Sequence, residues 1–368
     1  MPVPSPRPAR GPRVLRAAEC LLVWLVLLPA LARARAPADP PPGWPLGGGS
    51  VLQPASVEEG AAVLGAEDDF TRRMSPFDRQ ARLRVAAAVS GAEHRAFAAR
   101  AVLPWIAAER DRIGAAVEGL APRFEALGVR FPERVLLVKT SGDEEANAAY
   151  TRGTAVMLPQ GVLRSPPEAL RRLVCHELSH VLSRHDPALR ARLYAAVGFE
   201  PCGELELPGD LAARRITNPD APAFDQAIPV RCDGVERRMV PILFARGPYD
   251  AARRPPFLAT MEFRLIAVDV AGDPPQATAV LDAAGAPILR RPQEVEGFFE
   301  RTGRNTGYLI HPEEIVADNF VMLVNAADPA AAPPPSPEVV ARVAAAFRTP
   351  SGGTDAAPSA GRVDDAPR

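Results

Sequence analysis

The residues best placed to do chemistry are two histidines and a glutamate in the pentapeptide His176-Glu177-Leu178-Ser179-His180. In a helix, this H-E-x-x-H spacing sets both imidazoles on one face, because residues four apart lie above one another. Two imidazoles so placed can bind one divalent metal ion, and the glutamate beside them can serve as a general base. The pentapeptide therefore predicts a metal-hydrolase site, provided that the segment is helical. The alternative is a pair of hydrogen-bonded histidines on an ordinary core helix.

The surrounding sequence predicts that helix. Ser165 is placed to cap it, Pro166 and Pro167 suit a first helical turn, and Glu168 lies three residues after the cap. Apolar residues then recur at the spacing of a buried helix, at Leu170, Leu173, Val174, Leu178, Val181 and Leu182. We expect the helix to run from about residue 166 to residue 184.

A catalytic zinc ion usually takes three protein ligands and keeps a fourth position open, so a third ligand must come from elsewhere. The best candidate is Glu314, in a segment that opens at Pro312 and has a helical pattern. Asp318 follows Glu314 by one turn, where a second carboxylate can orient a ligating imidazole through its free ring N–H. Glu313 lacks this arrangement, because Ala317 occupies the equivalent position.

With H-E-x-x-H at 176–180 and E-x-x-x-D at 314–318, the chain resembles the gluzincin metallopeptidases, the zincin group related to thermolysin. The resemblance covers about residues 132–183 and 306–325. It implies an α+β fold with a zincin-like catalytic domain, zinc bound by His176, His180 and Glu314, Glu177 as general base and Asp318 as support for a ligand. The 133 residues between His180 and Glu314 are a longer connection than familiar members have.

Other acidic residues compete for the role of third ligand. Glu200, Glu204 and Glu206 lie closer in sequence, but Leu-Pro-Gly separates Glu206 from Asp210 and cannot continue a helix. Asp186 lies six residues after His180, where a metzincin-like peptidase has its third ligand. Ser183 stands where the tight turn of such a site needs glycine, so Asp186 is the second choice.

Two strands are expected before the helix, at residues 135–138 and 154–159. The resemblance implies that the strand directly before the active-site helix forms the upper rim of the cleft. An extended peptide would then pair with its free edge. The other interpretation is an ordinary hairpin whose connection contains Gly142 and Asn147.

Residues 1–36 have the pattern of a secretory signal peptide. Arginines precede an apolar run at 20–32, and Ala34-Arg35-Ala36 offers small residues for cleavage, although a retained anchor is the alternative. Removing six arginines and one acid from the chain totals of 43 and 44 leaves 37 basic and 43 acidic residues, a net charge near −6, which argues against a nucleic-acid partner. In an oxidising compartment Cys202 and Cys232 could form a disulfide, with Cys175 as a buried thiol.

The remaining organisation is read from composition and periodicity. We expect a Pro/Gly-rich lead at 37–55, a helical region at 56–128, a catalytic region at 129–325 and a strand-rich insertion at about 201–304. A linker, a short helix and a polar tail follow at 326–368.

The predicted function is zinc-dependent hydrolysis of peptide bonds by a secreted or periplasmic protein, with a peptide or protein as substrate. Zinc (Zn2+) would polarise the scissile carbonyl and activate its bound water, and Glu177 would accept the water proton and deliver it to the leaving nitrogen. Tyr308 and His311 are the nearest candidates in sequence for a donor to the oxyanion. The alternatives are a core tyrosine for Tyr308 and a helix cap for His311. A zincin-like module that binds metal or a partner without turnover is the alternative. Cleavage specificity and oligomeric state are open at this stage.

Overall fold

The computed structural model describes residues 43–326, 328 and 332–348, and these described residues belong to one compact unit. The signal segment predicted at 1–36 and the polar tail after residue 348 lie outside the described residues. Within the described ranges, no helix combines the length and the hydropathy needed to cross a membrane. The fold is mixed α+β, as the sequence predicts, with two separate sheets.

The first sheet packs against the helix that carries the H-E-x-x-H motif and has the strand order β1-β2-β3-β5-β4. Its strands are β1 (Trp44–Gly47), β2 (Ser50–Pro54), β3 (Arg134–Thr140), β4 (Tyr150–Arg152) and β5 (Ala155–Pro159). β2, β3 and β5 run parallel, whereas β1 and β4 are antiparallel edge strands. The segment predicted as a Pro/Gly-rich lead therefore contributes two strands to this sheet.

The two strands predicted at 135–138 and 154–159 exist as β3 and β5, but they do not form a hairpin. They pair in parallel, and the hairpin is the one between β4 and β5. The prediction that the strand directly before the active-site helix forms the edge is also wrong, because β4 lies outside β5. The edge strand is only three residues long, too short for its apolar pattern to mark it.

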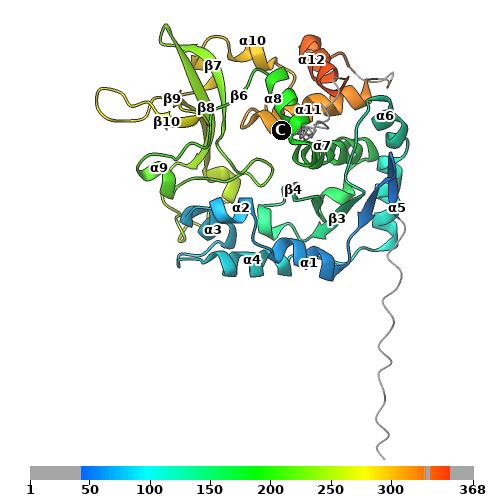
Figure 1. The fold of residues 1–368 in the computed structure, drawn as a ribbon. Helices are drawn as coiled ribbons and strands as arrows, with labels where there is room; N and C mark the ends of the chain where they lie inside the picture. The colour runs from blue at the N-terminus through cyan, green and yellow to red at the C-terminus, as the bar shows by residue number, and fades with distance from the viewer. Residues whose placement is uncertain (1–42, 327, 329–331, 349–368) are drawn as a thin grey trace, which may run out of the picture. The chain divides into compact units, whose positions relative to one another are not determined.

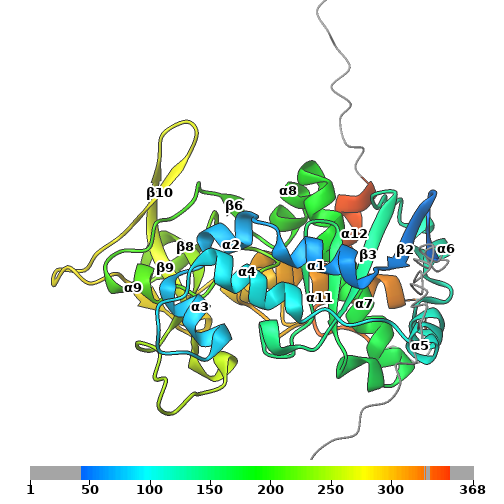
Figure 2. The same ribbon diagram turned by 90° about the horizontal axis from the view of Figure 1, so that it is seen from below.

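Helices cover both faces of the first sheet, which explains why β3 is almost continuously apolar. Val135 and Leu137 pack toward α7 (Pro167–His185), whereas Val138 packs among residues of α1 (Val57–Gly65) and α4 (Gly91–Arg100). Figure 2 shows α1, α2 and α4 along one side of the sheet. The other helices of the predicted helical region are α2 (Asp69–Arg73), α3 (Pro76–Leu83), α5 (Ala107–Val117) and α6 (Leu120–Ala126).

The helix α7 is the buried helix that the sequence predicts, shifted by one residue at each end. Its N-cap is Pro166 and makes no side-chain capping bond, so the predicted cap by Ser165 is wrong. Pro167 disfavours a helical conformation at the residue before it, which delays the start. Beyond α7, α8 (Pro187–Ala196), α11 (Pro312–Asn325) and α12 (Pro337–Arg348) pack together in a layer (Figure 1).

The residues between α8 and α11 build the second sheet, as the predicted strand-rich insertion requires. Its strands are antiparallel in the order β10-β9-β8-β7-β6, with β11 beside β9. Their bounds are Glu200–Pro201 for β6, Gln226–Cys232 for β7, Val235–Ala245 for β8, Met261–Ala271 for β9, Gln276–Ala279 for β10 and Leu289–Arg290 for β11. Two short helices flank the sheet, α9 (Asp210–Ala213) and α10 (Phe298–Thr302).

The disulfide predicted between Cys202 and Cys232 is wrong. The backbone N–H of Cys202 donates to the carbonyl of Asp225, at the start of β7, whereas Cys232 ends that strand. Six further residues of extended chain separate the two positions by roughly 20 Å, far beyond the reach of a disulfide. Cys175, Cys202 and Cys232 are all free and buried.

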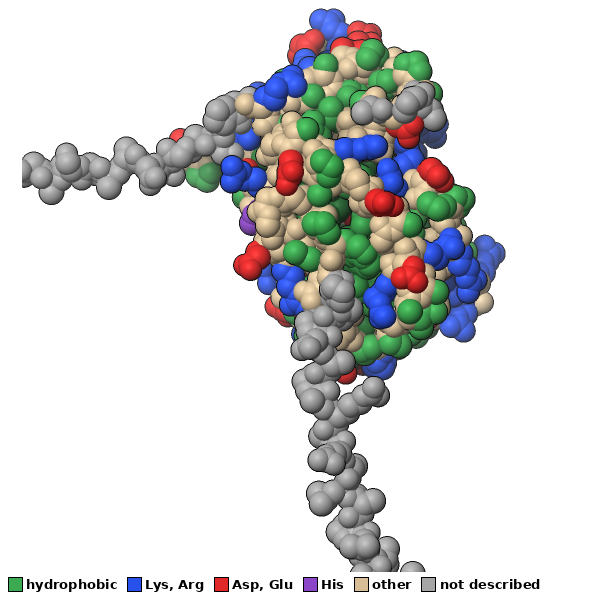
Figure 3. Space-filling model, turned by 90° about the vertical axis from the view of Figure 1, so that its right-hand side faces the viewer, with side chains coloured by type: hydrophobic (Ala, Val, Ile, Leu, Met, Phe, Trp, Pro, Cys, Tyr) green, Lys and Arg blue, Asp and Glu red, His purple; other side chains and the backbone are tan. Residues whose placement is uncertain are grey.

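The surface carries charges of both signs. On the face shown in Figure 3, acidic and basic side chains are scattered among apolar ones over the described residues. This pattern accords with the nearly balanced charge of the sequence.

Candidate metal centre

The structure brings His176 and His180 on α7 together with Glu314 on α11, across the 133 intervening residues. Glu314 Oε2 lies 3.1 Å from His176 Nε2 and 3.5 Å from His180 Nε2. One possible ligand atom from each of the three lies within 4.8 Å of the others, so this group could hold a metal ion. The two helices pack directly against each other, which sets the distance between the histidines and the carboxylate.

A second carboxylate fixes the orientation of each imidazole. His176 Nδ1 lies 3.0 Å from Asp318 Oδ1, and His180 Nδ1 lies 2.9 Å from Glu313 Oε1. Each ring therefore turns its Nε2 toward Glu314, and the partner on Nδ1 favours the tautomer in which Nε2 is free to bind a metal. Asp318 occupies the place that the E-x-x-x-D pattern predicts for it.

The unsatisfied atoms of the cluster fit a cation. His180 Nε2 and Glu177 Oε2 are buried and have no hydrogen-bond partner in the part of the chain that the structure describes. Glu314 and His180 are each only 1% exposed, and Glu177 is 2% exposed. Buried polar atoms are normally paired or bound to a metal, so the cluster has the composition of a metal site.

The same crowding shifts the pKa values of the cluster. Burial and the charge of Asp220 raise the pKa of Glu177 to about 8. Burial opposes a charge on His176, but hydrogen bonds to Asp318 and Glu314 outweigh it and raise its pKa to about 10. Burial also opposes the charge of Glu314, yet the neighbouring imidazoles hold its pKa below its usual range.

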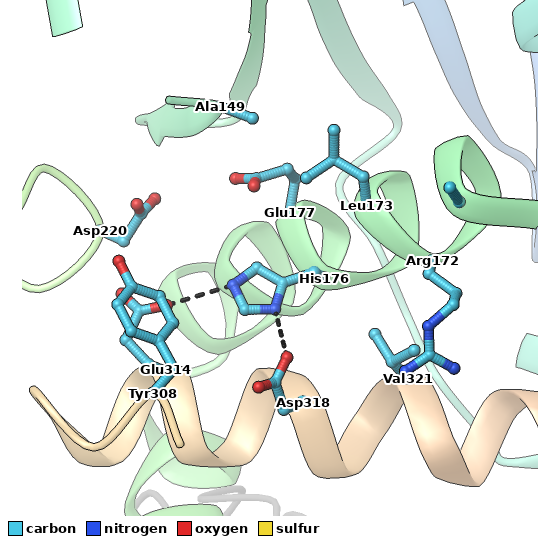
Figure 4. A pocket seen from close by; sticks show the side chains of 11 residues that line it. Ala149, Arg172, Leu173, His176, Glu177, Asp220, Tyr308, Glu314, Asp318 and Val321 are labelled. Atoms are coloured by element: carbon cyan, nitrogen blue, oxygen red, sulfur yellow. Dashed lines mark hydrogen bonds and ion pairs between the residues drawn. The ribbon is translucent and has the colours of Figure 1, made fainter. Parts of the chain in front are cut away.

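The cluster opens into a cavity of about 380 Å³ that Figure 4 shows from close by. Glu177 points its carboxylate into this cavity, across from Asp220. The ring of Tyr308 lies beside that of His176, with 6.3 Å between the centroids, and 43% of Tyr308 is exposed. The cavity is lined by Ala149, Ala169, Arg172, Leu173, His176, Glu177, Asp220, Tyr308, Glu314, Asp318 and Val321.

His311, the other predicted oxyanion donor, does not line this cavity. It is the N-cap of α11, and its Nδ1 accepts a hydrogen bond of 3.1 Å from the backbone N–H of Glu313. Its ring packs against Tyr194. The structure therefore gives His311 a capping position, the second of the two roles expected for it.

The competing third ligands lie elsewhere. The side chain of Asp186 accepts a hydrogen bond of 2.8 Å from Leu189 N and caps α8, which starts directly after α7 ends. Glu204 pairs with Arg73 at 2.6 Å, and Glu200 pairs with Arg238. Neither these three residues nor Glu206 belongs to the possible metal-binding groups found among the described residues.

Sequence reasoning missed three residues of the centre. Glu313 supports His180, which its position next to Glu314 could have suggested, because adjacent residues of one helix can face the same neighbouring helix. Asn218 donates to Glu314 Oε1 at 2.6 Å, and Asp220 forms a second possible metal-binding group with Glu177 and His180. The sequence around Asn218 and Asp220 shows only a turn pattern, and nothing in it indicates the contact with α7 or α11.

No family model matches the chain, and neither a curated protein nor a solved structure matches it. The likeness to gluzincins therefore depends on the two motifs and on the cluster that they form.

Proposed function

We propose that the protein is a zinc-dependent metallopeptidase of the gluzincin type, secreted or periplasmic, that hydrolyses peptide bonds. The observation that carries the proposal is the convergence of His176, His180 and Glu314 in one cluster, next to a cavity that Glu177 lines. Two imidazoles and one carboxylate are a common ligand set of catalytic zinc. A noncatalytic metal-binding module would have no need for the unpaired Glu177 carboxylate at this position.

Zinc bound at the cluster supplies Lewis-acid polarisation of a carbonyl and a lowered pKa for water. Glu177 would receive a proton from the attacking water and later deliver that proton to the leaving nitrogen. Its Oε2 atom makes no hydrogen bond to the described residues, so it is free to do so. A carboxyl beside the reacting atoms can accept a proton in one step and donate it in a later one.

Tyr308 is the residue best placed to stabilise the oxyanion. It lines the cavity beside His176, and the charge of Glu314, together with partial burial, keeps the pKa of Tyr308 above its usual range. The phenol therefore keeps its proton and can donate a hydrogen bond as negative charge develops on the carbonyl oxygen. Asp318 and Glu313 act indirectly, because they hold the imidazoles of His176 and His180 in place.

A cleavage profile of the mature protein, residues 37–368, tests the proposal. The zinc-loaded protein is incubated with a proteome-derived peptide library, and new termini are identified by mass spectrometry. We expect cleavage that a chelator abolishes and added zinc restores. The matched control is Glu177→Gln, which should retain zinc but cleave roughly a thousandfold more slowly, because an amide cannot transfer the proton. Cleavage that persists in this variant would exclude Glu177 from the mechanism.

A further inference from the structure

Residues 217–221 of the insertion, here called the strap, lie beside the metal cavity, which Asp220 lines. The strap is Thr217-Asn218-Pro219-Asp220-Ala221, and each of its residues is buried or half-buried although the segment has no regular secondary structure. It reaches both the first sheet and the cluster. Asn218 binds Glu314, and Asp220 lines the cavity.

The strap occupies the edge of the first sheet. The backbone N–H of Thr151, in the edge strand β4, donates to Asp220 Oδ1 at 2.7 Å, and the Thr151 hydroxyl donates to the same oxygen at 2.6 Å. Thr151 is 0% exposed. An extended peptide adding to this edge needs that N–H as a donor. The edge that a substrate would use is therefore not free.

Bonds from two helices, α3 and α7, hold the strap in place. Thr217 N donates to Asp78 Oδ2 at 3.0 Å, and Arg82 Nη2 donates to the carbonyl of Thr217 at 3.1 Å. Arg184, near the end of α7, donates to the carbonyl of Asp220 at 3.1 Å. The strap is therefore fixed relative to the metal-binding helix.

Asp220 also faces the metal cluster. It offers a ligand atom within 4.8 Å of those of Glu177 and His180. His180 also belongs to the group with His176 and Glu314. Figure 4 shows its carboxylate directed into the cavity toward Glu177. Because Thr151 binds Oδ1, the other carboxylate oxygen is left for the cavity side. Two buried carboxylates that face each other repel unless a cation lies between or beside them.

We infer that Asp220 is a fourth protein ligand of the metal ion, so that the strap closes the site against extended peptides. This inference rests on the proposed function. Displacing the strap would free both the coordination position and the Thr151 N–H. A peptide substrate needs the first to bind the metal ion and the second to pair with the strand edge. Access to the site then depends on the fraction of molecules in which the strap is displaced.

Zinc affinity of the full mature chain tests the inference. Asp220→Asn keeps an oxygen acceptor for Thr151 but removes the charged ligand, and Asp225→Asn is the matched control four residues after the strap. Competition with a chromophoric chelator should show zinc binding weakened about tenfold or more in Asp220→Asn, and unchanged in Asp225→Asn. With zinc saturating, Asp220→Ala, which removes the acceptor of the Thr151 N–H as well as the ligand, should hydrolyse peptides about tenfold faster or more than the wild type. Unchanged zinc affinity in Asp220→Asn, or hydrolysis by zinc-saturated Asp220→Ala that is no faster than that of the wild type, would overturn the inference.

A crystal structure of the zinc-loaded wild type gives a second test that needs no variant. We expect an Asp220 oxygen at about 2 Å from zinc, and a water molecule in that place would refute the assignment. The two proposals fail differently. Zinc binding that depends on Asp220 without hydrolysis by either form would contradict the peptidase and leave the ligand assignment standing.

Discussion

Replacing Glu313 by alanine probes the support of the metal site without touching a ligand. Glu313 Oε1 lies 2.9 Å from His180 Nδ1 and accepts from Ser183, while Oε2 accepts from Tyr194. The side chain is only 1% exposed, so water cannot easily replace it. Sequence reasoning rejected Glu313 as a metal ligand and gave it no other role, whereas in the structure it contacts the imidazole of His180.

The expected losses follow from these contacts. Removing an outer partner of a ligating imidazole weakens metal binding by about 10–100-fold, or about 1.4–2.7 kcal/mol. Three buried donors lose their acceptor, each at a cost of about 1 kcal/mol or more, so the free energy of unfolding of the metal-free protein should fall by about 3 kcal/mol.

Two assays measure these losses separately. Chelator competition gives the zinc affinity, and urea denaturation of the metal-free protein gives the free energy of unfolding. The control is Glu338→Ala, which removes an exposed acidic residue from the first turn of α12 and should change neither quantity. Zinc affinity in Glu313→Ala equal to that of the wild type would refute the claim that Glu313 orients His180.

Three further predictions concern the rest of the fold. Burial, together with nearby arginines, lowers the pKa of His94 to about 3, so this histidine stays neutral in the folded state. The unfolded chain binds a proton there below about pH 6.5, so the free energy of unfolding falls as the pH falls from about 6.5 toward 3. Urea denaturation at a series of pH values gives the slope of the free energy of unfolding against pH. In His94→Gln this slope should be smaller than in the wild type by up to about 1.4 kcal/mol per pH unit, and an equal slope would contradict the prediction. Arg82→Ala leaves Asp78 and Glu145 as buried unpaired carboxylates and should lower the free energy of unfolding by about 3–5 kcal/mol, whereas a loss under 1 kcal/mol would contradict a stabilising role. The denatured mature chain should react with a thiol reagent at three cysteines without prior reduction. Reaction at only one cysteine would indicate that the other two form a disulfide.

Local patterns predicted the parts of the centre that lie within single helices. The H-E-x-x-H and E-x-x-x-D spacings put His176 and His180 on one helix and Glu314 and Asp318 on another, as the structure has them. Periodicity also indicated α7 and β3, because both are buried over most of their length.

The features that sequence reasoning missed depend on contacts between distant segments. Strand pairing decides whether β4 or β5 forms the edge of the sheet, and the residues of one strand alone do not predict its pairing partners. Asp220 reaches the cavity because the insertion folds back over α7, and the two cysteines lie apart because β7 is extended between them.

Titration of zinc into the metal-free mature protein tests the central claim most directly. We predict one zinc ion per chain for the wild type, no stoichiometric binding by His176→Ala or His180→Ala, and severe weakening by Glu314→Ala. Asp186→Ala should bind as the wild type does, because Asp186 caps α8 and lies outside the cluster. Stoichiometric zinc retained with wild-type affinity by the variants at His176, His180 and Glu314 would contradict the account.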